Sequence, residues 1–70
     1  MNKLFTIVYE ESTTMINLCN LTQIYVEGSF IKVDCGSRVH AFAYSNNAYA
    51  EWYCRRLIEA ISEGEDGIEI

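Results

Sequence analysis

Two hydrophobic patterns divide the chain near residue 44. Before this point, apolar residues stand in short runs rich in Val, Ile, Phe and Tyr, with polar or glycine-containing segments between them, as in β-strands. After it, apolar residues recur every three or four positions, as in an amphipathic helix. No proline interrupts any strand. These patterns predict strands at 3–10, 15–19, 23–27, 30–35 and 38–44, a helix within 45–64, and a short last strand at 68–70.

The connections at the two ends of the chain carry weaker signals. Residues 11–14 are predicted to form a polar turn, and residues 20–22 form either a bend or a continuation of the second strand. The place of the first two strands in the sheet order stays open, because no diagnostic turn joins them. Ile68 and Ile70 alternate with Glu69, so a last strand would turn both isoleucines inward, with a frayed tail as the alternative.

Two glycine-containing loops predict a three-stranded meander in the middle of the chain. Gly28-Ser29 and Gly36-Ser37 each fit a two-residue hairpin loop that begins with glycine. Residues opposite one another in antiparallel strands share a face, and both loops select the same apolar face. This face consists of Ile24, Val26, Ile31, Val33 and Phe42. We expect the helix to pack on it, with His40 on the same face near Cys35 and the sheet edge.

The opposite face of the meander is less polar than a solvated sheet face usually is. It carries Tyr25, Phe30, Lys32, Val39, Ala41 and Ala43. Either the N-terminal strands fold over this face, or it packs against a second copy of the chain. In the second case Tyr25, Phe30 and Val39 form the contact of a homodimer.

Both ends of the helix are marked in the sequence. Ser45, Asn46 or Asn47 can cap the first turn with a side-chain oxygen, and Gly64 tolerates the left-handed conformation that commonly ends a helix. Between these ends runs one apolar stripe at the helical period. The stripe consists of Ala50, Tyr53, Cys54, Leu57, Ile58 and Ile61.

Trp52 departs from this pattern, because about 100° per residue turns it nearly opposite the centre of the stripe. Tyr49 lies three residues before it and Arg56 four residues after it. Trp, Tyr and Arg are enriched at binding hot spots, so this face is a candidate partner-binding surface. In the alternative, Trp52 covers the edge of the sheet or only supports a stacked Arg56.

The chain is acidic, with ten Asp and Glu against five Lys and Arg and a net charge of −5. This charge disfavours direct nucleic-acid binding, in which cationic side chains neutralise phosphates. It suits a protein partner with a basic surface, or it only keeps the protein soluble. The densest acidic cluster opposes the helix dipole at the helix end, which is compatible either with a functional patch or with the charges that an ordinary surface tolerates. It comprises Glu59, Glu63, Glu65, Asp66 and Glu69.

No motif indicates catalysis, a cofactor or a metal. A Cys–His nucleophile pair needs an orienting third group, which nothing supplies for Cys35 and His40. The three cysteines lack the close spacing of zinc ligands, and their odd number disfavours a disulfide framework. The four glycines stand singly at turns, so no phosphate-binding loop is present. We therefore expect a protein that is not an enzyme and that carries neither a cofactor nor a metal.

Neither a secretion signal nor a membrane span is recognised. The short apolar run near the start is interrupted by Thr6 and followed by Glu10 and Glu11 instead of a cleavage site. No stretch approaches the ~18 apolar residues of a membrane span. We expect a cytoplasmic protein without a membrane partner.

Together the patterns predict one α+β domain over residues 1–70, an antiparallel sheet of about five strands with one helix packed across one face. Protein binding is the expected function. The expected surface consists of Tyr49, Trp52, Arg56, Glu59, Glu63, Glu65 and Asp66. The alternatives are a homo-oligomeric structural or regulatory module and a protein that binds a small ligand or a metal.

In size, acidity and lack of a catalytic motif the chain resembles the small accessory proteins of phages and prophages, among them the anti-CRISPR and other anti-defence inhibitors. The resemblance covers this general character and no motif, so no functional residue follows from it. It implies an inhibitor that binds a host defence protein. Such an inhibitor would place its acidic patch in a basic groove that otherwise holds nucleic acid.

Overall fold

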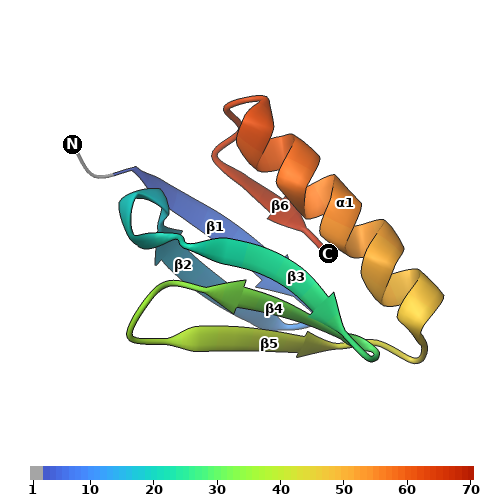
Figure 1. The fold of residues 1–70 in the computed structure, drawn as a ribbon. Coiled ribbons are helices and arrows are strands. Elements are labelled where there is room, and N and C mark those ends of the chain that lie inside the picture. The colour runs from blue at the N-terminus through green and yellow to red at the C-terminus, as the bar shows by residue number, and fades with distance from the viewer. Residues whose placement is uncertain (1–2) are drawn as a thin grey trace.

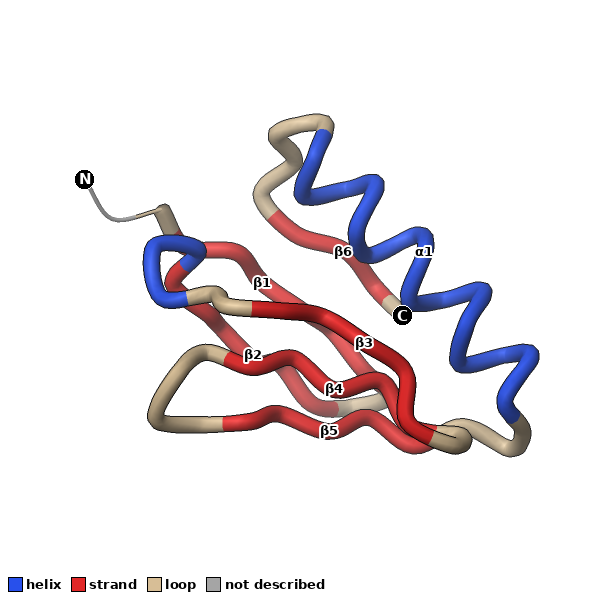
Figure 2. The backbone as a smooth tube through the Cα atoms, in the orientation of Figure 1, coloured by secondary structure: helices blue, strands red, loops and turns tan. Residues whose placement is uncertain are grey.

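The computed structural model describes residues 3–70 (Figure 1, Figure 2). Over this range the chain forms six strands, one α-helix and one short 3-10 helix. Their order is β1 (Leu4–Tyr9), β2 (Ser12–Asn17), η1 (Leu18–Asn20), β3 (Gln23–Glu27), β4 (Phe30–Asp34), β5 (Val39–Ala43), α1 (Asn47–Ser62) and β6 (Gly67–Glu69). The predicted α+β class is confirmed.

The strands form two three-stranded sheets, so the prediction of one sheet of about five strands is wrong. The first sheet has the order β2-β1-β6 and the second the order β3-β4-β5. In the N-terminal hairpin, Phe5 and Ile7 are fully buried and alternate with more exposed residues, so the first sheet has an apolar inner face of its own. Facing the two sheets toward one another buries both apolar faces at once, which one extended sheet would not do.

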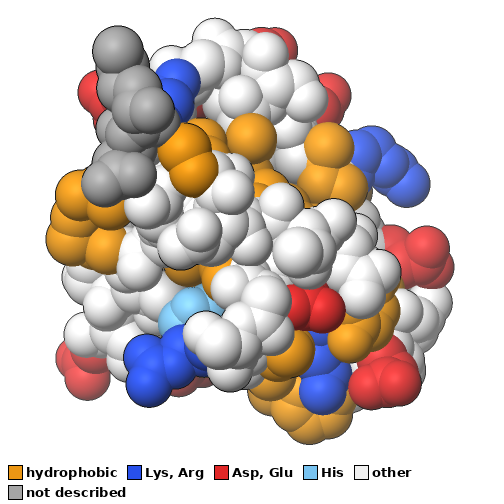
Figure 3. Space-filling view, turned by 60° about the vertical axis from the view of Figure 1, so that its left-hand side comes forward, with side chains coloured by type: hydrophobic (Ala, Val, Ile, Leu, Met, Phe, Trp, Pro, Cys, Tyr) orange, Lys and Arg blue, Asp and Glu red, His pale blue; other side chains and the backbone are white. Residues whose placement is uncertain are grey.

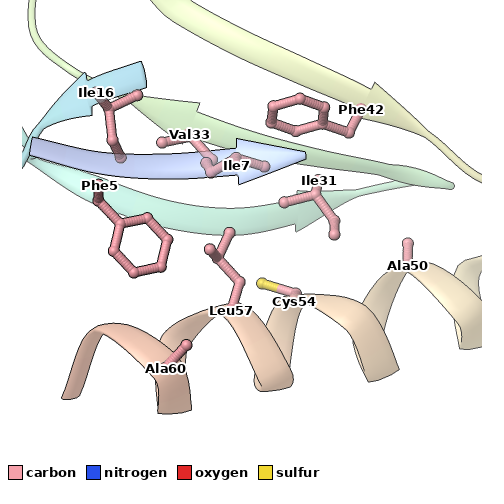
Figure 4. Close-up of a cluster of buried hydrophobic side chains, with 10 residues drawn as sticks. All are labelled: Phe5, Ile7, Ile16, Ile31, Val33, Phe42, Ala50, Cys54, Leu57 and Ala60. Carbon is pink, nitrogen blue, oxygen red and sulfur yellow. The ribbon is translucent and has the colours of Figure 1, made fainter. Parts of the chain in front are cut away.

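The core lies between the sheets and α1 (Figure 4). The first sheet contributes Phe5, Ile7 and Ile16, the second contributes Ile31, Val33 and Phe42, and α1 contributes Ala50, Cys54, Leu57 and Ala60. The helix packs against β3, β4 and β6 and so closes the sandwich along one side (Figure 1).

The apolar stripe of α1 differs from the prediction in one residue. Ile58 is 44% exposed, whereas Ala60 is buried. Because α1 contacts both β3 and β6, its buried arc is centred near Leu57, which is fully buried. Ile58 follows Leu57 by about 100° around the helix and therefore reaches the solvent-exposed rim beside β3.

The predicted helix ends are confirmed. The side chain of Asn46 accepts a hydrogen bond from the backbone N–H of Tyr49 at 2.9 Å. At the other end, Gly64 has a φ of 79°, and the N–H of Glu65 donates to the carbonyl of Ala60 at 3.0 Å. These bonds satisfy terminal backbone groups, so α1 begins and ends where its sequence signals stand.

The meander β3-β4-β5 has the predicted register. Val26 pairs with Ile31, and His40 pairs with Val33. Gly28 and Gly36 take positive φ values of 64° and 82°, as the two tight loops require. The predicted apolar face is the inner one. The N-terminal sheet also packs on this inner face, so the alternative in which it covers the outer face is wrong.

The N-terminal hairpin is tighter than predicted. β2 begins at Ser12, which pairs with Tyr9 across a loop of Glu10 and Glu11, so residues 12–14 belong to the strand and not to a turn. Glu10 adopts a φ of 54°, a left-handed conformation that tight hairpin loops require. After β2, the Asn17 side chain accepts from the N–H of Cys19 and starts η1, which ends the second strand earlier than expected.

The short last strand is present. β6 runs parallel to β1, and the flanking bonds from Thr6 N–H to the Asp66 carbonyl (3.0 Å) and from Ile70 N–H to the Val8 carbonyl (2.8 Å) hold it in place. Ile68 and Ile70 pack against the core, as predicted. β6 thereby becomes the neighbour of the C-terminal half of α1 (Figure 1).

Candidate functional site

One face of α1 carries most of the predicted partner-binding residues. We call it the helix stripe: Tyr49, Trp52, Arg56, Glu59 and Glu63, all exposed. Successive members are three, four, three and four residues apart, so they form one row along the helix. Its C-terminal half, formed by Arg56, Glu59 and Glu63, lies next to β6.

Trp52 contacts two neighbouring side chains although it is 49% exposed. The Arg56 guanidinium carbon lies 4.9 Å from the centroid of the Trp52 ring, within the range of a cation–π contact. Tyr53 meets the same ring edge-on, with centroids 4.8 Å apart and planes at 87°. The indole is therefore an oriented aromatic surface. Arg56 stacks on it, as one of the alternatives for Trp52 anticipated.

A chain of aromatic contacts connects Trp52 to the core. Tyr53 stacks on Tyr44 at 5.0 Å and 15° between planes. Tyr44 meets Tyr9 edge-on at 5.8 Å, and Tyr9 packs on Phe42 at 5.3 Å. The Tyr9 hydroxyl donates to the Ala43 carbonyl. Because this chain crosses from α1 to both sheets, it makes the position of Trp52 depend on the whole fold.

The hydroxyl of Tyr44 lies in an apolar environment. Burial, followed by the neighbouring Tyr9 and Tyr53, raises the pKa of Tyr44 to about 12. Its hydroxyl oxygen is buried and has no hydrogen-bond partner within residues 3–70. The phenol therefore stays neutral to a higher pH than an ordinary tyrosine does.

A groove of about 340 Å³ lies between the C-terminal half of α1 and β6, and we call it the acidic groove. It is lined by Arg56, Glu59, Ala60, Glu63, Glu65, Gly67 and Ile68. Three carboxylates stand around a small apolar floor, and Arg56 at one end is also in contact with Trp52. The carboxylates lie near the negative end of the helix dipole, so the groove favours a cationic group.

The acidic groove brings together four predicted residues, namely Arg56, Glu59, Glu63 and Glu65. Tyr49 and Trp52 continue the same face of α1 away from the groove. Asp66 does not line the groove, and its carbonyl is engaged by the N–H of Thr6. The sequence did not indicate Ala60, Gly67 and Ile68 as groove residues, because their role depends on the pairing of β6 with β1.

The residues proposed for a homodimer lie on the outer face of β3-β4-β5. Phe30 is 43% and Val39 49% exposed, whereas Tyr25 is half-buried. Lys32, at the centre of this face, lies 3.6 Å from a Glu27 carboxylate oxygen and 5.7 Å from the Phe30 ring centroid. The face is therefore apolar along β5 and more polar along β3.

The thiols of Cys35 and Cys54 are not activated as nucleophiles. Burial, with a further contribution from Asp34, raises the pKa of Cys35, and burial together with Glu51 raises that of Cys54. A raised pKa lowers the thiolate fraction at neutral pH. Within residues 3–70, no three His, Cys, Asp or Glu side chains are grouped closely enough to hold a metal ion.

The chain matches no protein-family model, no curated protein and no solved structure. In the part of the chain that the structure describes, no helix has both the length and the apolar character needed to cross a membrane. The geometry of the helix stripe and the acidic groove is therefore the basis for assigning a function.

Proposed function

We propose that this protein is a cytoplasmic protein-binding module that contacts its partner through the helix stripe and the acidic groove. The observation that carries this proposal is Trp52, which is half-exposed and yet in contact with both Arg56 and Tyr53. An aromatic anchor that is already ordered loses little conformational freedom when a partner covers it.

The charge of the groove favours a partner with a basic surface. Glu59, Glu63 and Glu65 stand beside Trp52 and Arg56, so a lysine or arginine of the partner can enter the groove while an apolar side chain covers the indole. Opposite charges across an interface accelerate association and fix its orientation. The net charge of −5 adds to this attraction.

The class of partner that suits these properties is a defence protein that binds nucleic acid. A small acidic protein of this kind acts as a phage-type inhibitor, of which the anti-CRISPR proteins are examples, by occupying a basic groove that would otherwise hold a nucleic acid. The proposal is supported by the size and charge of the chain and by the acidic groove beside an aromatic anchor. In this role the protein contacts no nucleic acid itself and catalyses no reaction.

A pull-down from bacterial lysate with tagged wild-type protein, read by mass spectrometry, tests the proposal. Trp52→Ala removes the anchor, and Phe30→Ala is the matched control, because Phe30 is an aromatic of similar exposure that lies on β4 and not on α1. We expect one stoichiometric partner that the Trp52 variant loses and the Phe30 variant retains. Equal recovery by both variants, or recovery of no partner, would contradict the assignment of the site.

A second candidate function is a homo-oligomeric structural or regulatory module, which the exposed apolar side of β5 favours. Phe30, Val39, Ala41 and Ala43 form a nearly uncharged strip on the outer face. Light scattering over a range of concentrations would then show a dimer that Phe30→Glu or Val39→Glu dissociates. A monomer at every concentration would eliminate this candidate.

A further inference from the structure

A second cleft lies on the side of the sandwich formed by the edge strands β2 and β5, away from α1. It has a volume of about 430 Å³, which is within the range of small-molecule sites. Its polar lining consists of Asn17, Asn20, Cys35, Ser37, Arg38 and His40, and we call it the Arg38–His40 cleft. Figure 3 shows the histidine at the surface with a basic side chain directly beside it.

The inner side of β5 explains why the sandwich is open at this end. Phe42 is buried between the sheets and packs on Tyr9, so it closes the end near α1. His40 precedes Phe42 by two residues on the same face but is polar and only half-buried. Among residues 3–70, the apolar side chains that line the space beside His40 are those of Met15 and Ile16, and the chain leaves the sheet there through residues 35–38.

The cleft has the opposite charge character from the acidic groove. No carboxylate lines it, although the chain has ten acidic residues. Arg38 stands two residues before His40 on an extended segment, so both side chains extend to the same side. Asp34, the acidic residue of this hairpin, uses its carboxylate to accept the N–H of Gly36 at 2.9 Å and the Gln23 side chain at 3.3 Å.

Arg38 is therefore available for an external anion. Within residues 3–70 the one ion pair joins Lys32 to Glu27, so no carboxylate of the described chain neutralises Arg38. A guanidinium presents a planar fork of N–H donors that matches a carboxylate or phosphate in two parallel hydrogen bonds. The side-chain oxygen of Asn17 accepts a hydrogen bond from the N–H of Cys19 at 2.9 Å. Its side-chain amide nitrogen is then the group that can donate at the rim of the cleft.

We propose that the Arg38–His40 cleft binds a small ligand through an oxyanion, either a phosphate or a carboxylate group. Arg38 supplies the charge and the paired donors, while His40, Ser37 and the two asparagines add single hydrogen bonds. Met15, which is largely exposed at the edge of the cleft, offers an apolar contact to the remainder of the ligand. This site shares no residue with the helix stripe or the acidic groove.

Backbone amide NMR of isotopically labelled protein tests the site directly. The probes are inorganic phosphate and acetate, with sodium chloride at matched ionic strength as the reference. We expect phosphate, acetate or both to cause saturable shifts confined to residues 15–20 and 35–40, and chloride to cause none. The two probes distinguish a phosphate site from a carboxylate site.

Two arginine variants supply the matched comparison. Arg38→Gln should weaken binding at least about tenfold, as expected when a charge-assisted pair of hydrogen bonds is lost. Arg55→Gln makes the same change in net charge on the exposed surface of α1, outside the cleft, and should leave affinity unchanged. Arg38→Lys keeps the charge but not the planar fork and should fall between them. Shifts that do not saturate, that spread over the surface, or that are equal in the two glutamine variants would overturn the proposal.

Discussion

The guanidinium of Arg56 lies over the indole of Trp52, with 4.9 Å between the arginine Cζ and the ring centroid. The two residues are one helical turn apart, so the pair forms as soon as α1 forms. Tyr53 also contacts the indole and is itself stacked on Tyr44. Arg56 therefore connects the acidic groove, which it lines, to Trp52, the aromatic anchor of the helix stripe.

Removal of the Arg56 side chain should therefore loosen Trp52 without unfolding the protein. We expect Arg56→Ala to lower the free energy of unfolding by about 0.5–1 kcal/mol, the magnitude of an exposed cation–π contact. Trp52 is the only tryptophan, so its fluorescence reports both the change in its environment and the urea transition. Arg55→Ala is the control, and an identical spectrum and midpoint for the two variants would show that the stack does not order the indole.

The rotation of α1 about its own axis relative to the core gives a second prediction. Leu57 is fully buried, whereas its neighbour Ile58 is 44% exposed. Leu57→Ala should cost about 2–5 kcal/mol, because it removes buried methyl groups and leaves a cavity between the sheets. This cost is a large part of the total stability of so small a domain. Ile58→Ala should cost much less, and chemical denaturation of the two variants measures the difference. Equal losses would mean that α1 is rotated toward the arrangement expected from the sequence.

The meander and the helix could be read from the sequence because local signals determine both. Gly28 and Gly36 fix the two loops, and a slip by one residue would expose Ile31 and Val33. Asn46 and Gly64 mark the ends of α1 in the same local manner. The helix stripe could also be predicted from the sequence, because its spacing follows from the helical period alone.

The separation into two sheets could not be read in this way. The alternation of Phe5 and Ile7 indicates that β1 has a buried face, but it does not indicate which sheet covers that face. The pairing of β6 with β1 joins opposite ends of the chain and has no local signal. The second wall of the acidic groove, formed by Gly67 and Ile68, depends on this pairing, so the sequence indicated the carboxylates but not the groove.

Gly67 is required where β6 approaches β1. A Cβ atom at this position would lie 2.6 Å from the carbonyl oxygen of Thr6, which belongs to the backbone of the neighbouring strand and cannot move aside. We expect Gly67→Ala to destabilise the protein by about 1–3 kcal/mol, as for other overpacked positions. It should also accelerate exchange of the Ile70 amide, which donates to the Val8 carbonyl at 2.8 Å.

Gly64→Ala is the control for Gly67→Ala. Gly64 has open space around it, and an alanine there meets only the cost of its positive φ of 79°, on the order of 1 kcal/mol. The Gly64 variant should leave the exchange of the Ile70 amide unchanged after correction for global stability. If both variants accelerate exchange of the Ile70 amide equally, the close approach of Gly67 to Thr6 does not determine the position of β6.

Tyr44 should make the stability of the protein fall at high pH. Its folded-state pKa of about 12 lies above the value near 10 of an unfolded tyrosine, so between these values the unfolded chain has lost the proton while the folded protein retains it. Deprotonation then favours the unfolded state, and the stabilisation present below pH 10 is lost as the pH rises toward 12. Tyr44→Phe should retain stability at neutral pH, because it removes a buried hydroxyl that has no hydrogen-bond partner within residues 3–70. It should also show a weaker decline between pH 10 and 12. Thermal unfolding across this range, with the exposed Tyr49→Phe as the control, measures the effect, and a decline that is as steep in Tyr44→Phe as in the wild type would assign it to the other tyrosines.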